Sequence, residues 1–148
     1  FRSVDAYDAD FNYVGQESIL RQDTDLPFSP NVIAGSELTW SLLRQAEKHQ
    51  LEASLLSKYV GQQYLDLSSD ENNVLDPYFF SDVRLRYVWQ TDFVKEVELT
   101  LLLRNIFDAQ FATNAWSYRY VFDGQTTLDQ GFYPQAGRNV LIGLMVRF

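Results

Sequence analysis

The sequence predicts an all-β protein and, more narrowly, a segment of an antiparallel transmembrane β-barrel. Two observations lead to this prediction: stretches of about ten residues with alternating polarity, and connections that are alternately long and short. The clearest stretch is 138–148, where every second residue is apolar: Val140, Ile142, Leu144, Val146 and Phe148. Successive side chains of a strand point to opposite faces, so these five form one apolar face that ends on an aromatic. Barrel strands have this pattern.

Five complete strands and one partial strand are expected. The complete strands cover 31–43, 50–61, 78–90, 95–105 and 138–148, and 1–14 holds the partial one. Long connections are expected at 15–30, 62–77 and 106–137, and short ones at 44–49 and 91–94. All long connections then lie at one end of the sheet and all short ones at the other, as in outer-membrane barrels with long extracellular loops and short periplasmic turns.

Aromatic residues support the same prediction, since they make up 16% of the chain. They gather toward both strand ends: Trp40, Trp89 and Phe148 at the short-turn end, and Tyr59, Phe79 and Phe107 at the long-loop end. Barrels carry such aromatic girdles at the two membrane boundaries. An ordinary half-buried sheet of a soluble domain, the alternative, needs no girdles.

The alternation also predicts the register of 78–90 against 95–105, which should turn at 91–94. One face should carry Val83, Leu85, Tyr87, Leu99 and Leu101, and the other Arg84, Arg86, Glu96 and Glu98. Opposite charges facing one another across strands stabilise a sheet modestly. Over the whole chain, the charged residues expected to face the barrel lumen are Glu52, Lys58, Arg84, Arg86, Glu96, Glu98 and Arg104.

Composition excludes several classes of function. The net charge of −8 argues against a nucleic-acid partner. The chain has no Cys, so disulfides, thiolate zinc sites and cysteine nucleophiles are excluded. The sequence contains no run of 18 apolar residues, so no transmembrane helix is predicted.

Neither catalysis nor metal binding is expected, and no cofactor. The one histidine, His49, falls in a short charged turn, where a solvated loop role is expected. Asp8, Asp10 and Asn12 have the spacing that opens a calcium loop, but Tyr13 replaces its glycine and Ile19 its bidentate glutamate. Glu96 and Glu98 have a separation that glycosidase carboxylates can have. Pairing with arginine on the neighbouring strand explains them better.

Six strands cannot close a barrel, because the smallest single-chain barrels have eight and an open edge cannot remain in lipid. We therefore expect 1–148 to be the C-terminal part of a larger barrel, or one piece of an assembly of several chains.

Several motifs resemble those of TonB-dependent outer-membrane receptors. Asn105-Ile106-Phe107-Asp108 resembles their Asn-Leu-Phe-Asp signature, and 133–139 (YPQAGRN) is similar to the approach to their final strand. The segments 58–66 (KYVGQQYLD) and 75–79 (LDPYF) look like further recurrent segments of these receptors. The resemblance extends from about residue 26 to the end of the chain.

This resemblance implies a function and partners. It implies a 22-stranded barrel in the outer membrane of a Gram-negative bacterium, whose plug domain and earlier strands lie outside this chain. It implies energised uptake of a scarce bulky ligand, such as a siderophore, cobalamin, glycan or peptide. The implied partners are outer-membrane lipid, the TonB complex acting through the plug, the barrel-insertion machinery and a surface lipoprotein. The apolar face of 138–148 would be the insertion signal.

Ligand contacts are expected in the extracellular connection 106–137. Asp123-Gly124 predicts a hairpin there. Its first strand would place Trp116, Tyr118, Tyr120 and Phe122 on one face, alternating with Ser117, Arg119 and Val121. The candidate ligand-binding residues are Trp116, Tyr118, Arg119, Tyr120 and Phe122. The aromatics either form a ligand platform or pack against neighbouring loops.

Two other classes of function stay open. The same strand pattern suits a passive outer-membrane pore or structural barrel, and a soluble β ligand-binding module is the third class. A plug domain upstream would separate a transporter from a pore, and detergent dependence would separate both from a soluble module.

Overall fold

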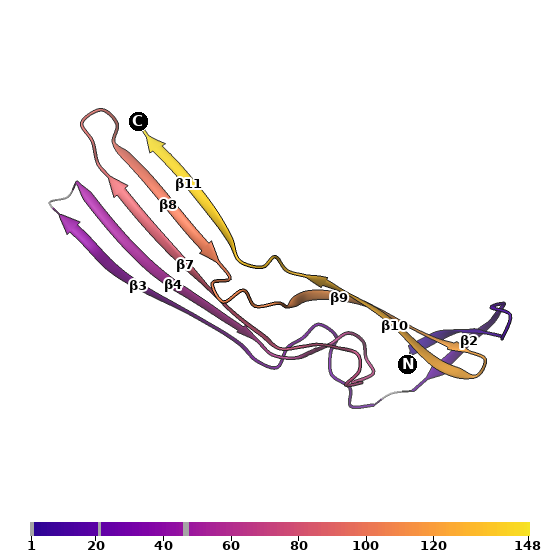
Figure 1. The fold of residues 1–148 in the computed structure, drawn as a ribbon. Helices are drawn as coiled ribbons and strands as arrows, with labels where there is room; N and C mark the ends of the chain where they lie inside the picture. The colour runs from indigo at the N-terminus through magenta and orange to yellow at the C-terminus, as the bar shows by residue number, and fades with distance from the viewer. Residues whose placement is uncertain (1, 21, 46–47) are drawn as a thin grey trace. The chain divides into compact units, whose positions relative to one another are not determined.

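The computed structural model describes residues 2–20, 22–45 and 48–148, and within them the chain is all-β (Figure 1). It has eleven strands, β1 to β11, and no helix among the described residues. Accordingly, this part of the chain offers no helix with the length and apolar character needed to cross a bilayer. The strands belong to two compact units. The five-stranded unit is Val32–Val60, Tyr78–Gln110 and Ala136–Phe148, and the four-stranded unit is Phe1–Asn31, Gly61–Pro77 and Phe111–Gln135.

The five-stranded unit is one antiparallel sheet. Its strands are β3 (Ile33–Gln45), β4 (His49–Val60), β7 (Tyr78–Trp89), β8 (Glu96–Arg104) and β11 (Asn139–Arg147). They run side by side in the order β11-β8-β7-β4-β3 (Figure 1). All five expected complete strands are confirmed, with ends shifted by a few residues. The expected short connection 44–49 is largely strand, and residues 46 and 47 lie outside the described part.

The predicted register is confirmed. Leu85 pairs with Leu101 and Tyr87 with Leu99, so these apolar residues share a face. Arg86 pairs with Thr100, which puts Arg84, Arg86, Glu96 and Glu98 on the other face. The remaining pairs continue this pattern, because Leu144 faces Leu99 and Ala53 faces Leu85. A one-residue slip anywhere would have inverted a whole strand.

One face of this sheet is apolar and uncovered. On β11, Ile142 is 74% exposed and Leu144 is 70% exposed. Other large apolar side chains on this face are also exposed: Leu38, Trp40, Phe79, Trp89, Leu99, Leu101, Val140 and Val146. Water-soluble monomers rarely leave a continuous apolar patch wider than a few hundred Å² exposed, and larger patches mark interaction surfaces.

The opposite face is polar and carries a ladder of ion pairs. Arg86 contacts Glu98 at 2.8 Å and Glu52 at 3.3 Å. Arg84 contacts Glu37 at 2.6 Å rather than either of the glutamates on β8. Further pairs join Arg147 to Glu96 at 3.3 Å and Arg104 to Asp82 at 3.8 Å. All seven charged residues that the sequence assigns to the lumen share this face by register.

The motif 105–108 makes a tight corner after β8. Asn105 is buried, and its amide nitrogen donates to the carbonyls of Ala109 at 2.9 Å and Ala136 at 3.4 Å. The Asp108 carboxylate accepts the backbone N–H of Arg138 at 2.7 Å. Asn105 and Asp108 both have positive φ, which Asn and Asp tolerate better than most residues. The corner therefore ties the end of β8 to the start of β11.

The four-stranded unit contains a sheet of order β10-β9-β1-β2. Its strands are β1 (Arg2–Tyr7), β2 (Tyr13–Ile19), β9 (Ala112–Phe122) and β10 (Gln125–Pro134). The predicted hairpin at Asp123-Gly124 is confirmed, and both turn residues have positive φ as a type I′ turn requires. β1 and β9 pair in parallel, an exception to the antiparallel pattern.

Two expectations for the N-terminal region are wrong. Segment 1–14 does not form a partial strand of the long sheet, because β1 and β2 form a hairpin in the four-stranded unit. Segment 15–30 is not all loop, since β2 continues to Ile19. The Asp8 carboxylate reverses the chain here by accepting the backbone N–H groups of Asp10 and Asn12 at 3.0 and 2.9 Å. Its hydrogen bonds with Asn12 lower the pKa of Asp8.

One face of the four-stranded sheet, called the inner face below, carries Ala115, Arg119 and Val121. It is stabilised by a small apolar core and a buried arginine. Val4, Ala6 and Val121 form one cluster, and Leu65, Leu75 and Ala115 form a second. Segment 62–77 contributes the short pair β5 (Gln63–Tyr64) and β6 (Val74–Leu75). Arg119 is buried and contacts Asp66 at 3.5 Å and Asp70 at 2.8 Å.

Replacing Arg119 by Met should therefore destabilise this unit by about 3 kcal/mol, because it leaves the buried Asp66 without its cation. Urea unfolding followed by Trp116 fluorescence, with Trp40 and Trp89 changed to Phe, measures the effect. Glu71→Gln is the matched control, since an amide at this exposed position can accept from the Gln62 amide and donate to the Tyr64 hydroxyl in place of the two bonds that the carboxylate accepts. Equal stability of the Arg119→Met and Glu71→Gln variants would contradict this role.

The same pair predicts a dependence on pH. The hydrogen bond from Arg119 lowers the pKa of Asp70 below its ordinary 3.8. A depressed folded pKa gives stability that is present above the unfolded pKa and is lost as the pH falls through the folded value. Unfolding measured from pH 6 downward should show wild-type stability falling below about pH 4. That fall should be shallower in Asp70→Asn, and identical slopes would exclude the pair as its source.

Candidate ligand-binding site

The outer face of the four-stranded sheet carries a row of aromatic side chains. Trp116, Tyr118, Tyr120 and Phe122 alternate along β9 with Ser117, Arg119 and Val121, as the sequence predicts. Trp116 is 48% exposed and Tyr118 is 41% exposed. The rings of Tyr118 and Tyr120 stack with centroids 5.6 Å apart. About 6.7 Å separates alternate residues of a strand, so the row is about 20 Å long.

The turn end of this row is packed against the N-terminal hairpin. Phe122 lies 4.3 Å from Phe11 between ring centroids. Tyr120 meets Tyr7 edge to face at 6.0 Å, and Tyr7 meets Tyr13 in the same way at 5.9 Å. The sequence left two interpretations of these aromatics open, a ligand platform and packing against neighbouring loops. In the structure, packing applies to the turn end of the row and a platform remains possible only at the other end. Tyr120 and Phe122 pack against residues of the N-terminal hairpin, whereas Trp116 and Tyr118 stay 48% and 41% exposed.

A polar network lies beside the open rings. The Tyr118 hydroxyl donates to the Asp5 carboxylate at 2.8 Å, and the Gln16 amide donates to its other oxygen at 3.0 Å. These two hydrogen bonds, the one from Tyr118 first, lower the pKa of Asp5. The bond to Asp5 also raises the pKa of the Tyr118 hydroxyl. At neutral pH the network therefore presents a carboxylate, an amide and a protonated phenol on one surface.

The indole of Trp116 lies over the neighbouring strand. Its cross-strand partner is Gly131, and a Cβ placed there would approach the indole closer than 3.0 Å. Gly131, which lies on the edge strand β10, thus leaves room for the indole, and the indole covers it. The Trp116 side chain stays 48% exposed in this position.

Sequence reasoning missed Tyr133, Asp5 and Gln16. Tyr133 pairs with Asn114 and so lies on the same face as Trp116, and it is 55% exposed. Counting outward from the Asp123-Gly124 turn would have found it. No local signal links Asp5 and Gln16 to Tyr118, because the parallel contact of β1 with β9 is formed between distant segments.

The other predicted site residues lie elsewhere. Arg119 lies on the inner face of the sheet, where its guanidinium is held by Asp66 and Asp70, so it does not join the aromatic row. On β11, Val140, Ile142, Leu144 and Val146 lie on the apolar face of the five-stranded sheet. Phe148 follows that strand and is 85% exposed.

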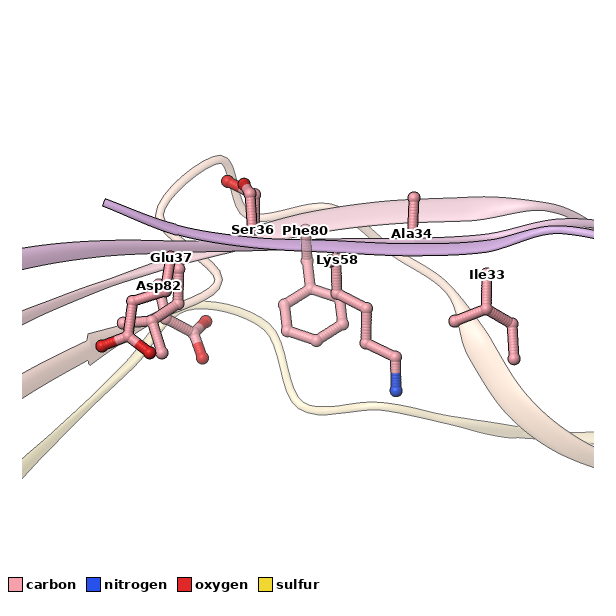
Figure 2. A pocket seen from close by; sticks show the side chains of 10 residues that line it. Ile33, Ala34, Ser36, Glu37, Lys58, Phe80 and Asp82 are labelled. Atoms are coloured by element: carbon pink, nitrogen blue, oxygen red, sulfur yellow. The ribbon is translucent and has the colours of Figure 1, made fainter. Parts of the chain in front are cut away.

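The polar face of the five-stranded sheet has a hollow of about 340 Å³. In Figure 2, Lys58, Phe80, Glu37 and Asp82 project to the same side of the sheet, and Ser36 projects to the other. Glu37 is bound by Arg84, and Asp82 accepts the backbone N–H of Asn105 at 2.8 Å. Lys58 has no carboxylate within ion-pair distance among the described residues, so its ammonium is the unpaired charge of this hollow.

His49 differs from its expected role as a solvated loop residue. It is the first residue of β4 and is half-buried, because that strand starts earlier than predicted and pairs with Trp89. Its Nδ1 lies 2.8 Å from the Tyr87 hydroxyl, and its ring stacks on Tyr87 and Trp89. Among the described residues, no three His, Asp or Glu side chains are grouped to hold a metal ion.

The division of the aromatic row makes a prediction about stability. Phe122→Ala should cost about 2 kcal/mol, because it removes the ring that packs on Phe11. Trp116→Ala, which removes a half-exposed ring, should cost less than about 1 kcal/mol. Thermal unfolding of both variants measures the difference. A larger loss in Trp116→Ala would mean that Trp116 serves packing.

Comparison with known proteins gives no assignment: no family model, no curated protein and no solved structure matches the chain.

Proposed function

We propose that this chain is part of a TonB-dependent outer-membrane transporter, and that the five-stranded sheet is a piece of its barrel wall. The observation that carries the proposal is the division of this sheet into two faces. An uncovered apolar face extends across five strands in register, and an ion-paired polar face lies behind it. Lipid on one side and a hydrated lumen on the other would suit both faces.

The connections support the same proposal. In the five-stranded sheet the β7–β8 turn and the C-terminus lie at one end of the strands (Figure 1). Segments 61–77 and 111–135, which connect β4 to β7 and β8 to β11, depart from the other end and belong to the four-stranded unit. In a barrel of this orientation, the short turn would be periplasmic and the four-stranded unit would be extracellular.

The edges of the sheet also fit a barrel segment. β3 and β11 each have one neighbour, so each offers an unpaired row of backbone groups. Such edges are unstable in lipid and must pair with further strands. The proposal therefore includes additional barrel strands and a plug, and places this protein in the outer membrane of a Gram-negative bacterium. It assigns binding and uptake to the protein, and no catalytic step.

A pair of substitutions on β11 tests the barrel wall. Leu144→Asp puts a carboxylate on the apolar face near the strand centre, where a charge costs up to a few kcal/mol in lipid. Gly143→Asp puts the same group on the polar face opposite Thr100, where a Cβ would make only an ordinary van der Waals contact with the Thr100 Cβ at 3.8 Å. Heat-modifiable, folded protein in isolated outer membranes should fall strongly for Leu144→Asp and little for Gly143→Asp. Equal yields would refute a lipid-facing assignment.

Deleting Phe148 tests the insertion signal. The resemblance implies that this terminal aromatic is read by the barrel-insertion machinery, so the deletion should lower the amount of folded protein in the outer membrane. Phe148→Tyr keeps an aromatic at the terminus and should assemble normally. Wild-type assembly of the deletion variant would count against the signal.

A passive pore, the alternative function, would differ from a transporter in its conductance. A transporter whose lumen holds a plug should give no steady current in a planar bilayer. A stable open conductance of the purified protein would favour a pore instead.

A further inference from the structure

We propose that the open end of the aromatic row binds a neutral oligosaccharide, with sugar rings stacked on Trp116, Tyr118 and Tyr133. This inference rests on the proposed function, in which the four-stranded unit contacts the ligand. It deepens that function by naming the class of ligand from the shape, the polar groups and the charge of this surface.

The shape of the surface favours flat, C–H-rich ligands. Trp116 lies over Gly131 and is 48% exposed, and Tyr133 lies on the same sheet face one step along β10. Tyr118 continues the surface along β9 and is itself 41% exposed. Aromatic faces carry negative charge, and the C–H groups on one side of a pyranose ring carry partial positive charge. A row of open rings therefore offers successive stacking positions to a chain of sugars.

The polar groups beside the rings can form hydrogen bonds with the hydroxyl groups of a sugar. Asp5 offers acceptor lone pairs, and the Gln16 amide offers both a carbonyl and N–H groups. Asp129, which pairs with Tyr118 across the hairpin, adds an exposed carboxylate. Sugar hydroxyls both donate and accept, so a mixed set of this kind can satisfy them.

The charge of the four-stranded unit argues against anionic ligands. The four-stranded unit has twelve Asp and Glu against three Arg, a formal charge of −9. Arg119, the arginine of this unit whose side chain is described, lies on the inner face. Phosphates and polycarboxylates would be repelled.

Calorimetric titration with defined hexasaccharides tests the proposal. The probes are cellohexaose, maltohexaose and xylohexaose, with hexagalacturonate as an anionic probe of equal length, and the protein is used as recovered from cells. At least one neutral hexasaccharide should bind, and hexagalacturonate should not. Trp116→Ala should weaken binding about tenfold, whereas Trp116→Phe should stay within about threefold, as expected for stacking.

Neighbouring residues on opposite faces of β10 provide the matched control. Tyr133→Ala should weaken binding, whereas Phe132→Ala, which removes an aromatic side chain 47% exposed on the other face, should leave it unchanged. Gly131→Ala should also weaken binding several-fold, because the new methyl group displaces the indole without removing a ring. Loss of binding in Phe132→Ala alone would overturn the site.

The outcomes separate this inference from the proposed function. If the protein is folded in the outer membrane but binds none of the neutral hexasaccharides, the ligand class is wrong and the barrel assignment stands. If it binds a hexasaccharide through Trp116 but is absent from the outer membrane, the transporter is wrong and the binding surface stands. Binding of hexagalacturonate with equal affinity would overturn the charge argument.

Discussion

Backbone hydrogen bonding in a continuous antiparallel register is the constraint on which the five-stranded unit depends. From β11 to β3, each strand pairs with its neighbour so that one face of the sheet is mainly apolar and the other face carries the charged residues. The register holds at Leu144 opposite Leu99 and at Arg86 opposite Thr100. Two surfaces of opposite character follow from it, without a second layer in this unit to cover either one.

Much of this sheet could be predicted from the sequence, because period-two polarity is a local property. The alternation alone gives β4, β7, β8 and β11, and Asp123-Gly124 gives the β9–β10 hairpin. The N-terminal hairpin could not be predicted in the same way. Aromatic residues at odd positions continue through the turn at Asp8, so the pattern resembled one uninterrupted strand. The turn is made by a side-chain carboxylate, a signal that alternation does not contain.

The candidate site was only partly predictable for a related reason. The aromatic row on β9 follows from one strand, and its alternation with Arg119 was visible in the sequence. Its polar neighbours come from β1 and β2, which join the row through a parallel pairing between residues more than a hundred positions apart. The ion partners of Arg119 come from a third segment. Contacts of this range depend on tertiary structure and leave no mark on local periodicity.

The corner at 105–109 has a consequence for how this protein can change. Asn105 hydrogen-bonds to the carbonyl of Ala136, and Asp108 to the backbone N–H of Arg138. These two bonds hold the two ends of the long connection 106–137 next to each other. The entropic cost of closing a loop rises only slowly with its length. Once its ends are fastened, the segment between them can lengthen, shorten or be exchanged while β8 and β11 keep their alignment. The corner thus allows the connection 106–137 to change in sequence and length. New binding surfaces can arise in it while the five-stranded sheet stays the same.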